Sequence, residues 1–198
     1  MSAAQLDVRS ALLERGALLE GHFRLSSGRH SDRFVQKFRI LEDPSLLEPV
    51  ARELAERFRS LEPSVVVSAA VGGILLGYEV ARAMGVKAIF VEKENGAPVL
   101  RRGFALSPHD RALVVEDVMT TGLSVREVVD VVRRHGAKVI GIGVIVNRGD
   151  ASFDSPQDDG VPVPVHALLE LPLRSYDERE CPRCRAGEPL VDPGSRRA

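Results

Sequence analysis

The residues best suited to chemistry lie in one short stretch of the chain. An apolar run ends in two adjacent carboxylates, Glu116 and Asp117, and a loop of hydroxyl side chains and glycine then opens a helix. Backbone N–H groups at a helix N-terminus lack partners and carry partial positive charge, so they attract a phosphate. Carboxylates only accept hydrogen bonds and therefore suit the hydroxyls of a ribose. The stretch predicts a pocket for ribose 5-phosphate, made of Glu116, Asp117, Val118, Met119, Thr120, Thr121, Gly122, Leu123 and Ser124.

Two well-known phosphate-binding patterns do not describe this loop. The G-x-x-x-x-G-K-[ST] of a Walker A loop is absent, and no G-x-G-x-x-G follows the strand as in a Rossmann fingerprint. A helix N-cap turn with two solvated acids remains an alternative interpretation of the stretch.

Two more predicted strands end in residues that a ligand could use. Ser68–Gly73 follows the apolar Val65–Val67, and its small residues, with Gly72 and Gly73 at the end, let a ligand approach the backbone. A tight packing turn is the alternative. Arg148 follows the last predicted strand, and its planar guanidinium suits bidentate binding of a carboxylate. A solvated surface arginine is the alternative there.

Alternating strand and helix patterns must position these three segments. We expect buried strands at 65–67, 86–91, 112–118 and 139–146, and helices at 4–15, 44–59, 74–84 and from about 125 to a stop at Gly136. Two short extended stretches are expected within 22–40, whereas 92–111 is predicted to be polar and irregular. Strand, helix, strand in this rhythm implies parallel pairing with right-handed crossovers. Ligands of such sheets bind at the carboxyl ends of the strands, where all three segments lie.

Composition narrows the class of protein. The 198 residues are 44% hydrophobic and 28% charged, an ordinary balance for one globular domain. A net charge of -1 gives no bias toward nucleic acid. No apolar run approaches the ~20 residues of a membrane span, and the polar N-terminus does not resemble a signal peptide. We therefore expect a cytoplasmic protein with neither a nucleic-acid nor a membrane partner.

The two cysteines, Cys181 and Cys184, form a single C-x-x-C in a proline-rich tail. Tetrahedral zinc needs four ligands, so two more would have to come from elsewhere, for example from a second subunit. A redox pair is expected at a helix start near a strand. Structural thiols are the interpretation that the sequence favours, and the role of the pair stays open.

The stretch from Glu116 to Gly122 resembles the motif with which type I phosphoribosyltransferases bind phosphoribosyl pyrophosphate (PRPP), although the family usually has a second small residue in place of Leu123. Ser68–Gly73 resembles the family's pyrophosphate loop. Gly21–Ser31 resembles the N-terminal segment of orotate phosphoribosyltransferases, and Arg148 stands 28 residues after Thr120, where those enzymes have an arginine that binds the base. The segment from 181 to 196 resembles the C-terminal tail of one bacterial and archaeal-like branch of that family.

The resemblance implies an α/β fold: a twisted parallel sheet flanked by helices, with a small hood subdomain. A single domain over 1–198 would have its core at 44–150 and its hood in 1–40 and part of 160–198. The implied reaction transfers the phosphoribosyl group of PRPP to orotate in pyrimidine biosynthesis. Thr120, Arg148 and the Phe34 ring would bind the base. Mg2+ would be held mainly by PRPP itself, with no clear protein ligand.

The family also implies a homodimer in which a loop at 92–111 reaches the neighbouring site. The usual Lys-x-His-Gly pattern of that loop is missing, so Lys93, Arg101 and Arg102 are the candidates for contact with the pyrophosphate, beside Asp117 as a catalytic residue. A solvated charged loop is the alternative. Two other functions remain open: transfer to a purine or another base, which needs no carboxylate-binding arginine, and a PRPP-sensing regulator, which usually carries an added nucleic-acid-binding module.

Overall fold

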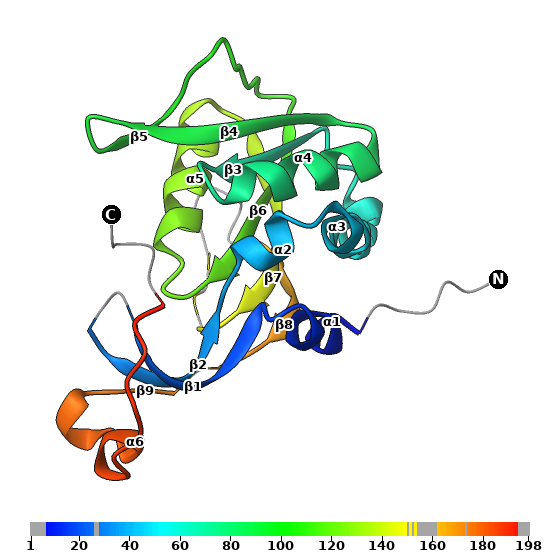
Figure 1. Cartoon of the computed structure of the whole chain (residues 1–198). Helices are drawn as coiled ribbons and strands as arrows, with labels where there is room; N and C mark the ends of the chain where they lie inside the picture. Colours follow the sequence, from blue (N-terminus) through cyan, green and yellow to red (C-terminus); the bar gives the residue numbers. More distant parts are fainter. Residues whose placement is uncertain are drawn as a thin grey trace.

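A six-stranded sheet forms the centre of the protein (Figure 1). The computed structural model describes residues 7–25, 28–149, 151, 153, 162–172 and 174–193. The strands of the main sheet are β3 (Val65–Ala69), β4 (Lys87–Glu94), β5 (Ala97–Leu100), β6 (Arg111–Met119), β7 (Lys138–Asn147) and β8 (Val165–Glu170). Their order is β5-β4-β3-β6-β7-β8, and all neighbours pair in parallel except β4 and β5. The predicted parallel α/β fold is thereby confirmed.

Helices cover both faces of this sheet. α3 (Pro44–Phe58) and α4 (Gly73–Met84) pack with Val66 on one face, while α5 (Leu123–Arg134) packs with Val65 and Val67 on the other. Successive residues of a strand point to opposite faces, which is why one short valine run serves both layers. Asp43 caps α3 as predicted, because its side chain accepts a hydrogen bond from the Ser45 amide.

The expectation of an irregular segment over 92–111 was wrong in its first part. β4 continues to Glu94 and turns back into β5, so that Glu94 pairs with Ala97. The turn is Asn95-Gly96, with φ of 52° and 83°. Asparagine followed by glycine is the strongest short signal for a two-residue hairpin, and it outweighs the polarity of the segment. Like β5, the strand β8 was not predicted from the sequence.

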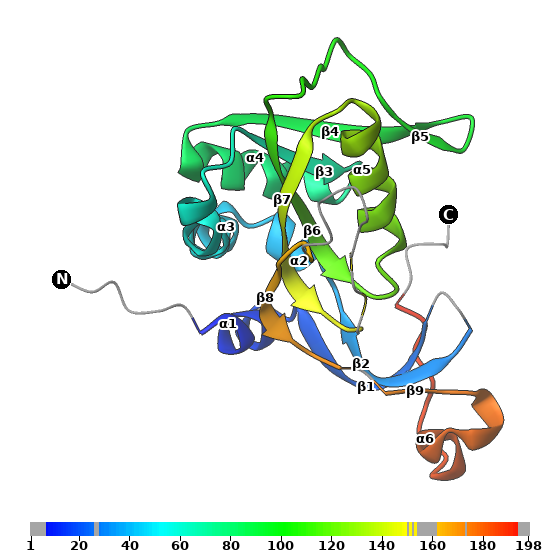
Figure 2. The ribbon, with the colours of Figure 1, turned by 180° about the vertical axis from the view of Figure 1, so that it is seen from behind.

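A second, three-stranded sheet lies beside the carboxyl ends of the main strands; Figure 2 shows the arrowheads of β6, β7 and β8 pointing toward it. It consists of β1 (Leu18–Arg24), β2 (His30–Val35) and β9 (Ser175–Tyr176), all antiparallel. We call it the hood sheet. Both ends of the chain contribute to it, as the resemblance implied, while the exact division into core and hood stays a prediction.

Short helices complete the described part. They are α1 (Val8–Glu14), α2 (Phe38–Leu41), α6 (Pro182–Arg185) and the single 3-10 turns η1 (Arg59–Leu61) and η3 (Glu178–Glu180). None of the helices in the described ranges is both long and apolar enough to cross a lipid bilayer.

Candidate active site

The loop between β6 and α5 is the centre of the candidate site. Its side chains Thr120, Thr121, Leu123 and Ser124 are exposed, and with the end of β6 they line a small cavity of about 50 Å³. Gly122 is the N-cap of α5, with φ of 74°, and no side chain caps the helix there. Among the described residues, no side chain caps the first amides of α5, which face the cavity edge as a phosphate cradle requires.

The two carboxylates before this loop are buried. Glu116 is 7% exposed and Asp117 1%. Burial, and then the charge of Asp117, raise the pKa of Glu116 to about 7. Each carboxylate accepts a backbone amide: Glu116 Oε1 from Asp117 at 3.1 Å, and Asp117 Oδ1 from Val118 at 2.7 Å. The alternative of two solvated acids is therefore excluded.

Lys37 is the site residue that sequence analysis missed. It lies between β2 and α2, and its Nζ is 3.1 Å from Asp117 Oδ1 and 3.0 Å from Oδ2. Oδ2 has no well-directed hydrogen bond among the described residues, so part of its accepting capacity is free for a ligand. The ion pair spans 80 positions of sequence, and no local pattern could have revealed it.

The small-residue segment after β3 lies directly against this ion pair. A Cβ atom added at Gly72 would be 2.5 Å from Asp117 Oδ2 and 2.7 Å from Lys37 Nζ. A Cβ at Gly73 would be 3.7 Å from Glu116 Oε1. Only glycine permits so close an approach at position 72. The predicted pyrophosphate loop and the predicted ribose-phosphate loop thus form one site, at the carboxyl ends of adjacent strands.

Arg148 joins the same site from the end of β7. Its amide donates to Met119 O at 2.8 Å, and a Cβ on the next residue, Gly149, would lie 2.2 Å from Thr120 O. The guanidinium is half-buried, and its Nε is buried without a hydrogen-bond partner among the described residues. Burial lowers the pKa of this group, although an arginine keeps its charge. An anion between Arg148 and the loop would compensate that buried donor.

The three cationic candidates of the β4–β5 region are all ion-paired. Lys93 Nζ lies 2.8 Å from Glu127 Oε1 on α5, and Arg102 lies 2.9 Å from Glu92. Arg101 contacts Glu92 and Glu94 at 3.7 and 3.4 Å. The Lys93–Glu127 pair places one candidate next to the first turns of α5, whereas both arginines stay on their own hairpin.

Phe34 lies in β2, and its ring packs against Phe23 on β1 with centroids 5.9 Å apart. Its contact with a base stays a prediction. Ser26, which stands where many orotate phosphoribosyltransferases have a substrate-binding lysine, lies outside the described residues.

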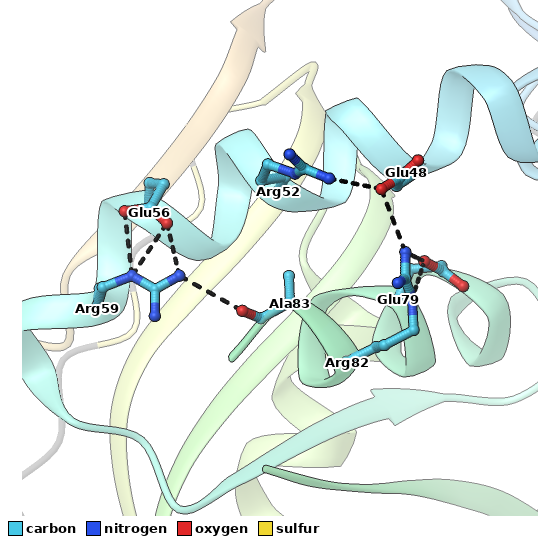
Figure 3. A pocket seen from close by; sticks show the side chains of 7 residues that line it. All are labelled: Glu48, Arg52, Glu56, Arg59, Glu79, Arg82 and Ala83. Atoms are coloured by element: carbon cyan, nitrogen blue, oxygen red, sulfur yellow. Dashed lines mark hydrogen bonds and ion pairs between the residues drawn. The ribbon is translucent and has the colours of Figure 1, made fainter. Parts of the chain in front are cut away.

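A larger cavity of about 280 Å³ lies elsewhere, between α3 and α4 (Figure 3). Its walls are lined by Glu48, Arg52, Glu56, Arg59, Glu79, Arg82 and Ala83. Every arginine there pairs with a glutamate, at 2.5 Å for Arg52 and Arg59 and 2.8 Å for Arg82. The charges of this cavity are already matched and it is remote from the strand ends, so size alone does not make it the site.

Several known proteins are similar to this chain in both sequence and fold. The phosphoribosyl transferase domain family matches residues 39–161. An orotate phosphoribosyltransferase of Pelotomaculum thermopropionicum is 50% identical over 182 residues, covering 92% of this chain and 93% of its own. One of Caldanaerobacter subterraneus subsp. tengcongensis is 48% identical over 178 residues, covering 90% of each chain. The crystal structure of orotate phosphoribosyltransferase from Aeropyrum pernix superposes with a TM-score of 0.63 at 28% identity, covering 83% of this chain and 93% of its own. With the geometry described above, these similarities show that the chain belongs to the orotate phosphoribosyltransferase family.

Proposed function

We propose that this protein transfers the 5-phosphoribosyl group of PRPP to orotate, releasing pyrophosphate and forming orotidine 5'-phosphate for pyrimidine biosynthesis. The choice of base rests on Arg148, which lies at the edge of the PRPP loop and whose buried Nε has no hydrogen-bond partner among the described residues. Orotate brings a carboxylate that a guanidinium can bind in a bidentate manner, whereas adenine, hypoxanthine and uracil do not.

The β6–α5 loop holds the ribose 5-phosphate. The amides of the first turn of α5 and the hydroxyls of Thr120, Thr121 and Ser124 surround the phosphate. Asp117 accepts a ribose hydroxyl through Oδ2, while Lys37 fixes the orientation of that carboxylate. Glu116 completes the grip, and its raised pKa allows it to donate a hydrogen bond as well as accept one.

The side chains of the site fit a Mg2+ ion that is held mainly by the phosphate oxygens of PRPP and only weakly by the protein. Mg2+ in phosphate sites keeps several waters and takes few protein ligands beside the phosphate oxygens. Asp117 is already neutralised by Lys37 and Glu116 is partly protonated near neutral pH, so neither is a strong inner ligand. When bound, the ion neutralises the charge that grows on the departing pyrophosphate. The backbone amides around Gly72, next to Asp117 and Lys37, would hold that pyrophosphate.

Lys93, Arg101 and Arg102 supply positive charge to the pyrophosphate after exchanging their present glutamate partners for phosphate oxygens. The three cations are 50–62% exposed, although Glu92 and Glu127 are only 16% and 24% exposed, so solvent screens each pair in part and each stabilises the protein by about 1 kcal/mol. A polyanionic substrate can therefore replace the glutamates. We further propose that the protein is a cytoplasmic homodimer in which the 92–111 segment reaches the neighbouring site.

The reaction needs no covalent intermediate. Bond cleavage at the ribose gives an oxocarbenium-like transition state, and the ring nitrogen of orotate attacks while Arg148 holds its carboxylate. Phe34 covers the base from the hood sheet, and exclusion of water prevents hydrolysis of PRPP.

Orotate consumption tests this proposal directly. Orotate absorbance should fall on adding PRPP and Mg2+, and adenine, hypoxanthine and uracil should not be consumed. Arg148→Ala removes a charged hydrogen bond of about 1.5–3 kcal/mol, so the KM for orotate should rise about 10- to 100-fold while that for PRPP changes little. Arg59→Ala, in the remote α3–α4 cavity, is the matched control and should leave both constants unchanged. Consumption of a purine alone, or equal changes in both KM values, would contradict the assignment of orotate.

A further inference from the structure

Four side chains that bind soft metal ions converge away from the active site. They are His22 on β1, His30 on β2, and Cys181 and Cys184 at the start and inside of α6. Their ligand atoms all lie within 4.8 Å of one another. The β1–β2 hairpin and α6, which are far apart in sequence, are neighbours in Figure 1. A zinc site at the C-x-x-C needs two more ligands, and His22 and His30 of this same chain are in position to supply them.

Four of the six distances between the ligand atoms fit a tetrahedron around one metal ion. His22 Nε2 is 3.1 Å from His30 Nδ1, 3.5 Å from Cys181 Sγ and 3.6 Å from Cys184 Sγ, and His30 Nδ1 is 3.2 Å from Cys184 Sγ. With Zn–N of about 2.0–2.1 Å and Zn–S of about 2.3 Å, tetrahedral geometry gives about 3.4 Å between two nitrogens and about 3.55 Å between nitrogen and sulfur. Each of these four distances agrees with the tetrahedral values to within about 0.4 Å, and the two remaining pairs, His30–Cys181 and Cys181–Cys184, lie within 4.8 Å.

The hydrogen bond of His22 Nδ1 outside the cluster determines which ring nitrogen carries the proton. Nδ1 lies 2.9 Å from the backbone oxygen of Glu188, which can only accept, so Nδ1 carries the hydrogen. Nε2 therefore presents a lone pair to the centre of the cluster. A metal-binding histidine commonly donates its second N–H to a backbone carbonyl in this way, because the hydrogen bond fixes the tautomer and the ring.

Burial argues for a closed, structural site. His22, His30 and Cys181 are 4%, 1% and 1% exposed, and Cys184 is partly buried. Two thiolates balance the charge of a divalent ion, and four protein ligands leave no open position for substrate. Tetrahedral N2S2 coordination is typical of zinc.

We propose that His22, His30, Cys181 and Cys184 bind one structural Zn2+ ion, which clamps the C-terminal segment onto the β1–β2 hairpin. The same contact is reinforced by backbone hydrogen bonds, from Val191 N to His22 O at 2.8 Å and from Arg24 N to Val191 O at 2.9 Å. The clamped hairpin leads directly to Lys37, so the ion supports the frame of the active site without touching substrate.

Elemental analysis of the full-length protein tests the proposal, using protein made in zinc-supplemented medium and purified without chelators or a metal-binding tag. We expect about one zinc per chain. The double substitution Cys181→Ser and Cys184→Ser should reduce the zinc content about tenfold or more. His109→Asn changes an exposed histidine outside the cluster and should retain the zinc.

A measurement on the wild-type protein covers the case in which the double variant does not fold. After exchange of zinc for Co2+, the protein should show the visible absorption of tetrahedral cobalt together with a thiolate-to-cobalt charge-transfer band. Purified protein without stoichiometric metal, with iron in place of zinc, or with a disulfide between the two cysteines would overturn the proposal. Zinc retained by a folded double variant would overturn it as well.

Discussion

Glu116 offers a test of the electrostatics of the PRPP loop that does not depend on catalysis. This carboxyl is 7% exposed beside the buried Asp117, and its pKa is raised from 4.5 to about 7. Replacing it with glutamine keeps the shape of the protonated form and removes the titration. The pH dependence of stability should then differ between wild type and Glu116→Gln.

The sign of this pH dependence depends on whether the folded or the unfolded state binds the proton of Glu116 more tightly. The folded protein holds this proton up to about pH 7, whereas the unfolded chain releases it near pH 4.5, so wild-type stability falls as pH rises between these values. The difference of about 2.5 pKa units corresponds to about 3 kcal/mol as an upper bound. Glu116→Gln should therefore match wild type below pH 4.5 and exceed its free energy of unfolding by up to about 3 kcal/mol above pH 7.

Urea unfolding at a series of pH values measures this difference. The chain contains no tryptophan, so circular dichroism is the suitable signal. Both proteins should be unfolded at the same zinc concentration, because a bound metal adds its own contribution. Parallel pH profiles for the two proteins, or a glutamine variant less stable than wild type at pH 8, would refute the assignment of a raised pKa to Glu116.

Two further substitutions probe the neighbourhood of the site, and a third probes the opposite edge of the main sheet, at the amino ends of its strands. Lys37→Met leaves the buried Asp117 without its cation and should lower the free energy of unfolding at neutral pH by about 1–3 kcal/mol; an unchanged urea midpoint would argue against the ion pair. Gly149→Ala places a Cβ 2.2 Å from Thr120 O, so the loop must shift and kcat/KM should fall by about tenfold or more, whereas unaltered kinetics would contradict the close packing. Burial opposes ionisation of Asp110, but hydrogen bonds from a backbone amide, two serines and a lysine outweigh it and lower its pKa to about 2. Asp110→Asn should thus be less stable than wild type at pH 7 by up to about 2 kcal/mol, and the difference should vanish as pH falls from 3.8 toward 2, opposite to the profile of Glu116→Gln.

Local patterns predicted most of the main sheet. The valine run before Glu116, the loop with Gly122 and the apolar face of α5 are all read within a few residues of one another, and the structure has them where predicted. The Asn95-Gly96 turn predicts a hairpin, whereas the polar residues around it favour an irregular segment, and the turn signal is the stronger of the two. β8 was missed because its sequence, Val-His-Ala-Leu-Leu-Glu, alternates too weakly to distinguish a strand from a helix.

Contacts between distant segments could not be predicted in the same way. Sequence analysis assigned Asp117 to the ribose but had no means of finding Lys37, which approaches it from 80 positions earlier. His22 and Cys181 are 159 positions apart, so the C-x-x-C gave no sign of its histidine neighbours. Spacing reveals residues that share one helix or strand, whereas pairs like these depend on how whole elements pack.

The pairing of β2 with β9 also sets an order on folding during synthesis. Ser31 Oγ donates to Arg174 O, and Ser31 pairs with Ser175, so these partners are translated more than a hundred residues apart. While the ribosome makes the main sheet, the outer edge of β2 has unpaired backbone groups that a strand of another nascent chain can join. β9 is made after all the strands of the main sheet and closes that edge, so the hood sheet is completed after the main sheet.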